Sequence, residues 1–353
     1  MTTSLVNQKL QFWAYRVSTI LKSFKTLYTL PPEKIKAFLD SYVIYDHDWV
    51  NEEELIREMG QDYYSQVQKK LVDYYCVLNH LCAIGQVEKM YIPPAMDLSK
   101  NLIQNQVLFE QRMSRDLGLK KGKKVLDIGC GRGRVANHMA SHSGASVTGI
   151  NIDPDQLEAA NRFAKGNGMS DLCHFQRGDL NETLPFPDNS FDSVYEIQAV
   201  FSLAKDPVKV FSEIHRVLKP GGKFGSLEWV RLDQYDPKNT HHVDLMKRIK
   251  PLIGAIGTLS IDEAVKYLEE AGFEIVTNEN ASINGLQAPL IQKADKFFTR
   301  MTRLLKGLVR VKILPGHFET LFDRLTKDGQ AFVEADQLGL VTTSHYMIAR
   351  KKK

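Results

Sequence analysis

Cysteine is scarce in this chain of 353 residues, and its four cysteines form no recognisable motif. Cys76, Cys82, Cys130 and Cys173 include no Cys-x-x-Cys pair and are too dispersed for the disulfide framework of a small secreted domain. We therefore expect reduced thiols in a cytoplasmic protein. A zinc site is not expected either, nor is any other metal site.

The chain also lacks a strong excess of charge of one sign. Its 46 Lys and Arg residues nearly balance 42 Asp and Glu residues, which leaves a formal net charge of +4. This excess is too small to predict nucleic-acid binding, and no nucleic-acid motif is recognisable. Because 43% of the residues are hydrophobic, the chain has ample material for the core of one large or two modest domains.

An uninterrupted apolar run is missing from the first thirty residues. Apolar side chains recur there at helical spacing, but Lys9, Arg16, Lys22 and Lys25 interrupt them, which argues against both a spanning helix and a signal peptide. A helix over residues 5–29 could lie in a membrane interface through its aromatic and basic side chains, or it could dock on the protein's own core. The sequence leaves both interpretations open.

The most informative stretch is a short apolar strand that runs into a glycine-rich turn and then a helix. Residues 125–128 are aliphatic apart from Asp127, and Gly129, Gly131 and Gly133 allow backbone angles and close approaches that a Cβ atom would forbid. The helix expected near residues 135–141 would direct its free N–H groups toward the turn. This pattern predicts a site for a nucleotide-like ligand.

The spacing of the glycines favours one kind of nucleotide. A dinucleotide fingerprint has the pattern Gly-x-Gly-x-x-Gly, whereas the third glycine comes one residue early here. Asp127 lies two residues before the first glycine, where its carboxylate would repel a pyrophosphate but would suit a cationic amino group. The turn therefore favours S-adenosyl-L-methionine (SAM), whose methionine part carries such a group.

From residue 123 onward, strand and helix signals alternate, which predicts an α/β fold with a mostly parallel sheet covered on both faces. After the first strand we expect further strands at 146–150, 174–179, 191–197, 223–229, 273–276 and 346–349, and the last of them completes the sheet. Helices are expected within 33–90 and at 102–117, 211–218, 261–271 and 293–312.

Polar residues follow the second and third expected strands, where ligands of such sheets bind. Asn151 stands at the end of the second strand, where an acid usually holds a ribose, and Asp153 comes two residues later. Asp179 ends the third expected strand and could accept a hydrogen bond from an adenine amino group. An ordinary turn aspartate is the alternative interpretation of Asp179.

The chain resembles the class I SAM-dependent methyltransferases, and within them the sterol 24-C-methyltransferases. The glycine turn, Gly178-Asp179, the Pro-Phe-Pro-Asp lead before Phe191 and Leu218-Lys-Pro-Gly-Gly222 carry the broader resemblance. The narrower one rests on residues 149–151, 169–171, 228–230, 235–236, 314–316 and 339–350. It covers roughly residues 60 to 350 and is densest from 122 to 240.

The resemblance implies a Rossmann-like, mostly parallel sheet with three regions. Residues 1–118 would form a helical N-terminal region, residues 119–235 the SAM-binding core, and residues 236–353 a substrate-cap region that completes the sheet. The implied activity is transfer of a methyl group from SAM to a carbon atom of a sterol or related isoprenoid lipid.

The resemblance also implies site residues. The implied cofactor-binding set is Asp127, Gly129, Cys130, Gly131, Gly133, Asn151, Asp153, Gln156, Asp179, Leu180 and Glu196. Candidates near the transferred methyl group lie at the ends of the fourth and fifth strands. Tyr195 is one, Gln198 is expected to position the acceptor, and Glu228 would stabilise a cation or remove a proton. A structural hydrogen bond at the sheet's end is the alternative role for Glu228.

Several positions depart from the family pattern. Gln198 replaces an acid, Ser202 replaces a histidine, Arg132 and Arg134 replace small or aliphatic residues, and the family's aromatic segment does not continue after Tyr75. These departures predict a divergent member whose acceptor differs from the usual sterol side chain. An O- or N-methyltransferase of a small natural product and a non-catalytic SAM- or lipid-binding protein remain alternatives.

The expected helix at 293–312 has one basic side and one apolar side. The basic residues are Arg300, Arg303, Lys306 and Arg310, and the apolar residues opposite are Met301, Leu304, Leu305 and Leu308. By the resemblance this helix would be a lid that also touches a membrane surface, for example that of the endoplasmic reticulum or another internal membrane. A merely solvated charged face is the alternative, and a homo-oligomer is also open.

Overall fold

The structure is a computed structural model that describes residues 17–47, 52–85, 87–201 and 203–352. The described residues fall into two compact units. The helical unit contains those within residues 1–47, 53–90 and 294–329, and the sheet unit contains those within 48–52, 91–293 and 330–353.

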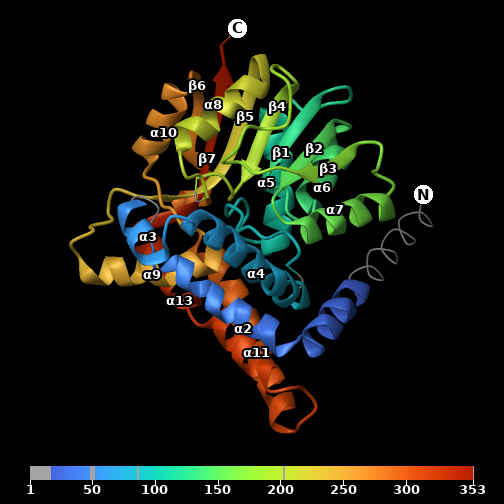
Figure 1. Cartoon of the computed structure of the whole chain (residues 1–353), viewed down its shortest axis with the longest axis vertical. Helices are drawn as coiled ribbons and strands as arrows, with labels where there is room; N and C mark the ends of the chain where they lie inside the picture. The colour runs from blue at the N-terminus through green and yellow to red at the C-terminus, as the bar shows by residue number, and fades with distance from the viewer. Residues whose placement is uncertain (1–16, 48–51, 86, 202, 353) are drawn as a thin grey trace. The chain divides into compact units, whose positions relative to one another are not determined.

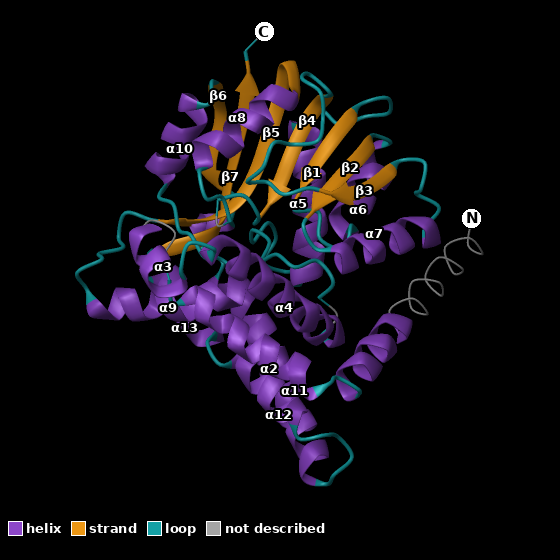
Figure 2. Cartoon of the chain, viewed as in Figure 1, coloured by secondary structure: helices purple, strands orange, loops and turns teal. Residues whose placement is uncertain are grey.

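The sheet unit is built on seven strands in the order β3-β2-β1-β4-β5-β7-β6 (Figures 1 and 2). Strands β1 to β5 run parallel to one another, and β7 pairs antiparallel with both β5 and β6. The strands are β1 Lys124–Ile128, β2 Ser146–Asn151, β3 Cys173–Arg177, β4 Phe191–Ile197, β5 Leu218–Arg231, β6 Phe273–Asn280 and β7 Val341–Lys351. This arrangement confirms the predicted α/β fold with a mostly parallel sheet.

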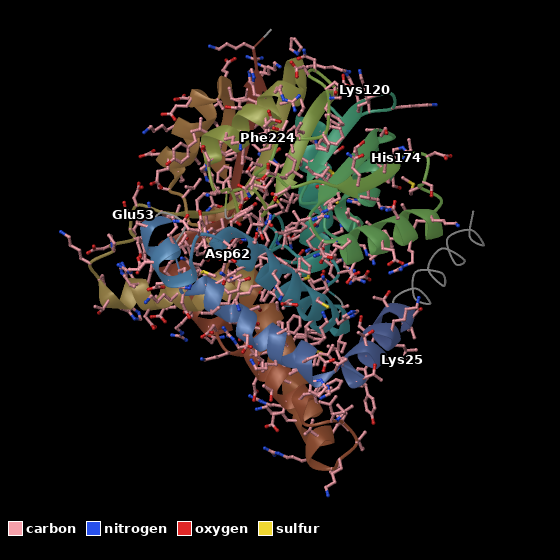
Figure 3. All side chains as sticks on the ribbon, in the orientation of Figure 1. Lys25, Glu53, Asp62, Lys120, His174 and Phe224 are labelled. Atoms are coloured by element: carbon pink, nitrogen blue, oxygen red, sulfur yellow. The ribbon has the colours of Figure 1, made fainter. Side chains whose placement is uncertain are left out.

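Helices cover both faces of the sheet, as the alternating pattern predicted. Helices α5 (Leu102–Asp116), α6 (Arg134–Ser143) and α7 (Pro154–Gly166) belong to one layer, and α8 (Pro207–Val217) and α10 (Ile261–Glu270) belong to the other. On β4, Tyr195 faces the first layer and Val194 the second. Full burial of a large side chain such as Phe224, which Figure 3 shows inside this unit, contributes about 2 kcal/mol.

Side-chain caps explain where several helices begin. Asp153 accepts hydrogen bonds from the backbone N–H groups of Asp155 and Gln156, and Pro154 occupies the first helical position of α7. Capping boxes start α5 at Asn101 and α10 at Ser260. The remaining helices of this unit are α9 (Thr240–Ile253), most of α13 (Gly329–Gln337) and the first turns of α11 (Ala288–Arg310).

Several strand boundaries differ from the prediction, and one of them is the end of β6, which continues past the expected residue 276 to Asn280. Strand β3 ends at Arg177, so Asp179 lies beyond it. Strand β5 begins at Leu218, because the pairing with β4 jumps across residues 219–222 and resumes at Lys223. Strand β7 is much longer than the expected 346–349, because its threonine and serine residues are paired and buried as well.

The helical unit packs around an aromatic core. It contains a helix over residues 17–28, α2 (Pro32–Ser41), the 3-10 turn Tyr42–Tyr45, α3 (Glu52–Met59), α4 (Tyr63–Ile84), the end of α11 and α12 (His317–Thr326). The rings of Phe38, Tyr42, Tyr45 and Tyr74 contact one another, and the Arg324 guanidinium lies 3.8 Å from the centre of the Tyr42 ring. The helices that the structure describes between residues 32 and 84 agree with the helical prediction for this region.

The helix at 17–28 docks on its own unit. His317 Nε2 lies 2.7 Å from the carbonyl oxygen of Leu27, and the rings of Phe24 and Phe318 are 5.3 Å apart. This contact matches the docked interpretation for the second half of the expected 5–29 helix, and residues 5–16 lie outside the described residues.

The apolar side of α11 is divided. Leu305 is buried at 4% exposure, whereas Leu304 is 65% exposed, so the apolar side chains of this helix differ in burial. Phe297, Leu304 and Val311 recur at a spacing of seven residues and are all exposed, with Ile313 close behind. We call these four residues the outer stripe. No described helix is both long and apolar enough to cross a membrane.

Candidate active site

The glycine turn after β1 is held against β2 and β4. Gly129, Gly131 and Gly133 all have positive φ, and the N–H groups of Gly129 and Cys130 donate to the carbonyl oxygen of Ile150 at 3.0 Å. A Cβ atom on Gly133 would lie 2.6 Å from Cζ of Phe175. The turn therefore requires glycine for both conformation and space, as the sequence predicted.

Asp127 lies at the end of β1 and is almost fully buried, with 4% exposure. The hydroxyl of Tyr195 donates to its Oδ2 at 2.9 Å. Burial, together with the nearby carboxyls of Glu196 and Glu110, raises the pKa of Asp127 to about 8, although the hydrogen bond from Tyr195 lowers it in part. No Lys, Arg or His of the described chain pairs with Asp127, so this carboxyl is suited to a cationic ligand. Tyr195 is itself fully buried and supports Asp127.

A second buried acid near the turn was not predicted from the sequence. Glu110 on α5 accepts a hydrogen bond from the Tyr91 hydroxyl at 2.7 Å through Oε1, and its Oε2 contacts Nδ1 of His138 on α6. The sequence did contain one signal for the burial of Glu110. This residue lies three residues before Met113 and seven before Leu117, and so on the apolar face of α5.

Residues 91–97, here called the anchored segment, are fixed by side chains from several elements. Gln106 Nε2 donates to the Tyr91 carbonyl at 2.9 Å, and Gln287 Nε2 donates to that of Pro93 at 2.9 Å. Ser282 Oγ accepts from the Ala95 N–H at 2.9 Å, and Asn105 Oδ1 accepts from the two N–H groups that follow, both at 2.8 Å. The sequence indicated only a break here, because these partners are distant along the chain.

Gln198 also holds the anchored segment. Its Nε2 donates to the carbonyl oxygens of Ile92 at 2.8 Å and Thr343 at 2.9 Å, and its Oε1 accepts from the Ile92 N–H at 3.1 Å. Gln198 has a φ of 54°, which directs the chain away from β4. Because a carboxylate has no hydrogen to give two carbonyls, this geometry accounts for an amide at this position.

Glu196 and Glu228 form a buried carboxyl pair at the ends of β4 and β5. Both have 0% exposure, and their side chains are hydrogen-bonded to each other. Burial raises the pKa of both, and the negative charge of Glu196 raises that of Glu228 further. Two carboxyls in such contact retain at least one proton between them at neutral pH, so the pair carries at most one negative charge, which it has in its singly protonated form.

Backbone N–H groups and a hydroxyl surround this pair. Glu196 accepts from the N–H of Ala199 at 3.0 Å and from the Ser226 hydroxyl, and Glu228 accepts from the N–H of Phe201 at 2.8 Å. Glu196 follows Tyr195 on β4, so its side chain lies on the face opposite the layer that Tyr195 joins. Ser202, the other departure noted here, lies outside the described residues.

The remaining predicted site residues gather beyond β2 and β3. Asn151 Oδ1 accepts from the Asp153 N–H at 3.0 Å, and Gln156 Nε2 donates to Asp153 at 3.0 Å. The Asp153 carboxyl thus caps α7, while Gln156 Oε1 lies 3.2 Å from the place of a Cβ on Gly131. Asp179 Oδ1 accepts from the N–H of residue 181 at 2.9 Å, and Leu180 packs on the core.

The two arginines of the turn are also placed. Arg134 Nη1 donates to the Arg132 carbonyl at 2.9 Å, and its guanidinium lies 3.7 Å from the centre of the Phe163 ring. The chain's own aromatic residue therefore contacts Arg134. Burial raises the pKa of the Cys130 thiol well above its usual range, which keeps the thiol neutral.

The comparisons of this chain with known protein families and sequences identify methyltransferases. A family described as "Methyltransferase domain" matches residues 126–225. The sterol 24-C-methyltransferase ERG6A of Gibberella zeae is 32% identical over 292 residues, which are 77% of this chain and 73% of that protein. The cycloartenol-C-24-methyltransferase 1 of Oryza sativa subsp. japonica is 28% identical over 90% of this chain and 93% of that protein.

A solved structure supports the fold. The mycolic acid cyclopropane synthase CmaA1, complexed with SAH and CTAB, superposes with a TM-score of 0.62 at 17% identity and covers 75% of this chain and 90% of that one. At this identity the similarity concerns the fold alone.

We expect Gln198→Glu to destabilise the protein, because the new carboxylate would face two carbonyl oxygens. The new carboxyl should have a higher pKa in the folded than in the unfolded protein. The loss of folding stability is therefore absent below the unfolded-state pKa and grows as the pH rises through the folded-state pKa. Urea unfolding should show a loss of about 2–3 kcal/mol at pH 8 and a smaller loss at pH 5. The matched control is Gln176→Glu on exposed β3. Equal stability of the two variants at pH 8 would contradict the assignment.

Proposed function

Because the chain belongs to the sterol 24-C-methyltransferase family and is a SAM-dependent methyltransferase, we propose that it methylates a carbon atom of a sterol or related isoprenoid lipid. The observation that carries the proposal is the buried carboxyl pair of Glu196 and Glu228 at the ends of β4 and β5. A negatively charged, water-excluded pair suits a reaction that passes through a carbocation and then releases a proton.

The residues around the turn fit the cofactor SAM. When bound, SAM supplies an electrophilic methyl group on a sulfonium. Asp127, which has a buried carboxyl and no cationic partner in the described chain, would hold the ammonium of the methionine part. Asn151 would bond a ribose hydroxyl, and Asp179 would accept from the adenine amino group. The turn glycines and Gln156 border the same place.

We assign the main catalytic work of the protein to positioning and to proton acceptance. The reacting carbon must be held in line with the methyl group and the sulfur, and a closely packed site can supply this order. After alkene methylation, a C–H bond of the cation breaks, its electrons form the new double bond, and the proton passes to the charged carboxyl pair. Both Glu196 and Glu228 are then neutral.

Gln198 is a positioning residue in this proposal. Its amide is engaged with the anchored segment and with β7, so it acts through the backbone. The loss of an acid at this position also favours a second candidate function, methyl transfer to oxygen or nitrogen of a smaller acceptor, which needs no cation stabilisation.

The function can be tested with labelled SAM and a panel of sterol and isoprenoid alkenes. We expect label in a carbon skeleton, and Glu228→Gln should lower kcat by about 100-fold or more while leaving SAM affinity unchanged. Glu269→Gln, on the exposed surface of α10, is the control. Label in an ether or amine would favour the second candidate, and SAM binding without any labelled product would indicate a non-catalytic protein.

The affinity for SAM should depend on pH through Asp127. The folded-state pKa of about 8 means that the carboxyl is mostly protonated at pH 7, so binding of an ammonium must release a proton. We expect affinity to rise about tenfold per pH unit below that value and to level off above it. Calorimetry in buffers of different ionisation enthalpy measures both quantities. Asp127→Asn should bind weakly and without this slope, and an unchanged slope would refute the assignment.

We also propose that the enzyme meets its lipid at the cytoplasmic surface of an internal membrane. The outer stripe exposes Phe297 and Leu304 on α11, and Val311 and Ile313 just after its end. Exposed cationic residues flank the stripe at Lys296, Arg300, Arg303, Arg310 and Lys312. Apolar side chains bordered by cations suit an anionic phospholipid surface, to which each cation adds about 1 kcal/mol.

Vesicle sedimentation can test this surface. The double variant Leu304→Asp, Val311→Asp should lose binding to vesicles that contain anionic phospholipid, and Arg300→Glu, Arg303→Glu should bind weakly and with less salt dependence. The matched control is Val276→Asp, Leu338→Asp, at two exposed apolar positions of the sheet unit. Equal binding by both double-aspartate variants would exclude the stripe as the contact.

A further inference from the structure

His345 on β7 is a buried imidazole that the proposed chemistry does not use. It has 2% exposure, and neither Nδ1 nor Nε2 has a hydrogen-bond partner among the described residues. An unpartnered polar atom in such a place destabilises the folded protein. The place of His345 on β7, between β5 and β6, therefore leaves both nitrogens available to a partner that binds from outside the chain.

The register of the sheet places His345 beside the carboxyl pair. His345 is directly opposite Glu228 in the antiparallel pairing of β5 and β7. Residues opposite each other in such a pair project from the same face, with Cβ atoms about 5 Å apart. Glu228 accepts from the N–H of Phe201, so the segment after β4 lies over this same part of the sheet.

Other buried polar atoms near this end of β5 also lack a partner among the described residues, namely Trp229 Nε1 and Thr258 Oγ1. Thr258 is 5% exposed, and its Oγ1 has no partner among the described residues. The next residue, Leu259, accepts a hydrogen bond from the Arg231 N–H at 2.8 Å, which fixes this segment beside the end of β5. Unfulfilled hydrogen-bonding capacity is therefore concentrated where β5 ends and β7 begins.

The chemistry of His345 selects a neutral ligand group. Burial lowers the pKa of His345 to about 4, whereas burial raises that of Glu228, so the imidazole is too weak a base to take a proton from the carboxyl pair. A neutral imidazole offers one N–H donor and one nitrogen acceptor. A hydroxyl group can satisfy either, and it adds no charge to a site that already carries one.

We propose that His345, on the same face of the sheet as Glu228, binds a hydroxyl group of the methyl acceptor. This inference rests on the proposed function, and it narrows the acceptor to a lipid with a hydroxyl group that can lie close to the carboxyl pair. A site built to bond a hydroxyl rejects an analogue without one far more strongly than a hydrophobic pocket rejects a change in size. His345 would thus determine specificity and take no part in proton transfer.

The test compares a hydroxylated acceptor with its deoxy analogue. For the wild type we expect a lower KM for the alcohol. His345→Phe, which keeps a flat ring and removes both nitrogens, should raise the KM for the alcohol about tenfold or more and leave that for the deoxy analogue unchanged. It should also raise the unfolding midpoint of the acceptor-free protein, because it replaces an unpartnered polar group with an apolar one.

Further variants and measurements separate this inference from the proposed function. His345→Gln, which retains a donor and an acceptor, should recover part of the preference for the alcohol, and SAM affinity should be unchanged in both variants. Equal KM values for alcohol and deoxy analogue in the wild type, or equal losses for both in His345→Phe, would overturn the assignment and point to an ordered water or to packing. Absence of turnover with every lipid acceptor would instead refute the proposed function.

Discussion

The site depends on one electrostatic constraint: acidic groups are buried at the ends of β1, β4 and β5, and no cationic side chain of the described residues pairs with them. Asp127 and the Glu196–Glu228 pair obtain their stabilisation from hydroxyl and backbone donors and from retained protons. Such groups are costly to ionise in the absence of a ligand. A cationic cofactor, and later a cationic intermediate, would lower the free energy needed to ionise these groups. The site therefore favours ligands with a positive charge.

The anchored segment is the second feature of the site, and it is held in place by hydrogen bonds. It has little regular structure, yet side chains from α5, from the end of β4 and from Gln287 hold its backbone at successive positions. Gln198 can do this because an amide both donates and accepts. If an acid stood there, it would add another charge to an already acidic region and would lose two hydrogen bonds to carbonyls. The departure from the family pattern at residue 198 is therefore a consistent part of this structure.

Local signals were sufficient to predict the core of the fold. The strand 191–197 and the glycine turn were correctly predicted, because their β-branched residues and their glycines encode conformation within a few residues. Strand β7 was underestimated, since Thr342, Thr343 and Ser344 look like loop residues until Gln287 and Asn280 bond them. The contacts of Glu110 and the orphaned His345 could not be predicted either, because they arise from pairings between residues far apart in sequence.

Glu228 can be interpreted as a structural hydrogen-bond acceptor or as a group that takes part in the reaction. The number of protons on the carboxyl pair bears on the choice between the two. If the pair only anchored the segment after β4, a neutral amide in place of one carboxyl could serve as well, because the N–H donors of Ala199 and Phe201 need only oxygen acceptors. Two acids at this position add something that anchoring does not require, namely one negative charge and room for one more proton. Since burial makes that charge expensive, the arrangement is best explained by a reaction that uses it.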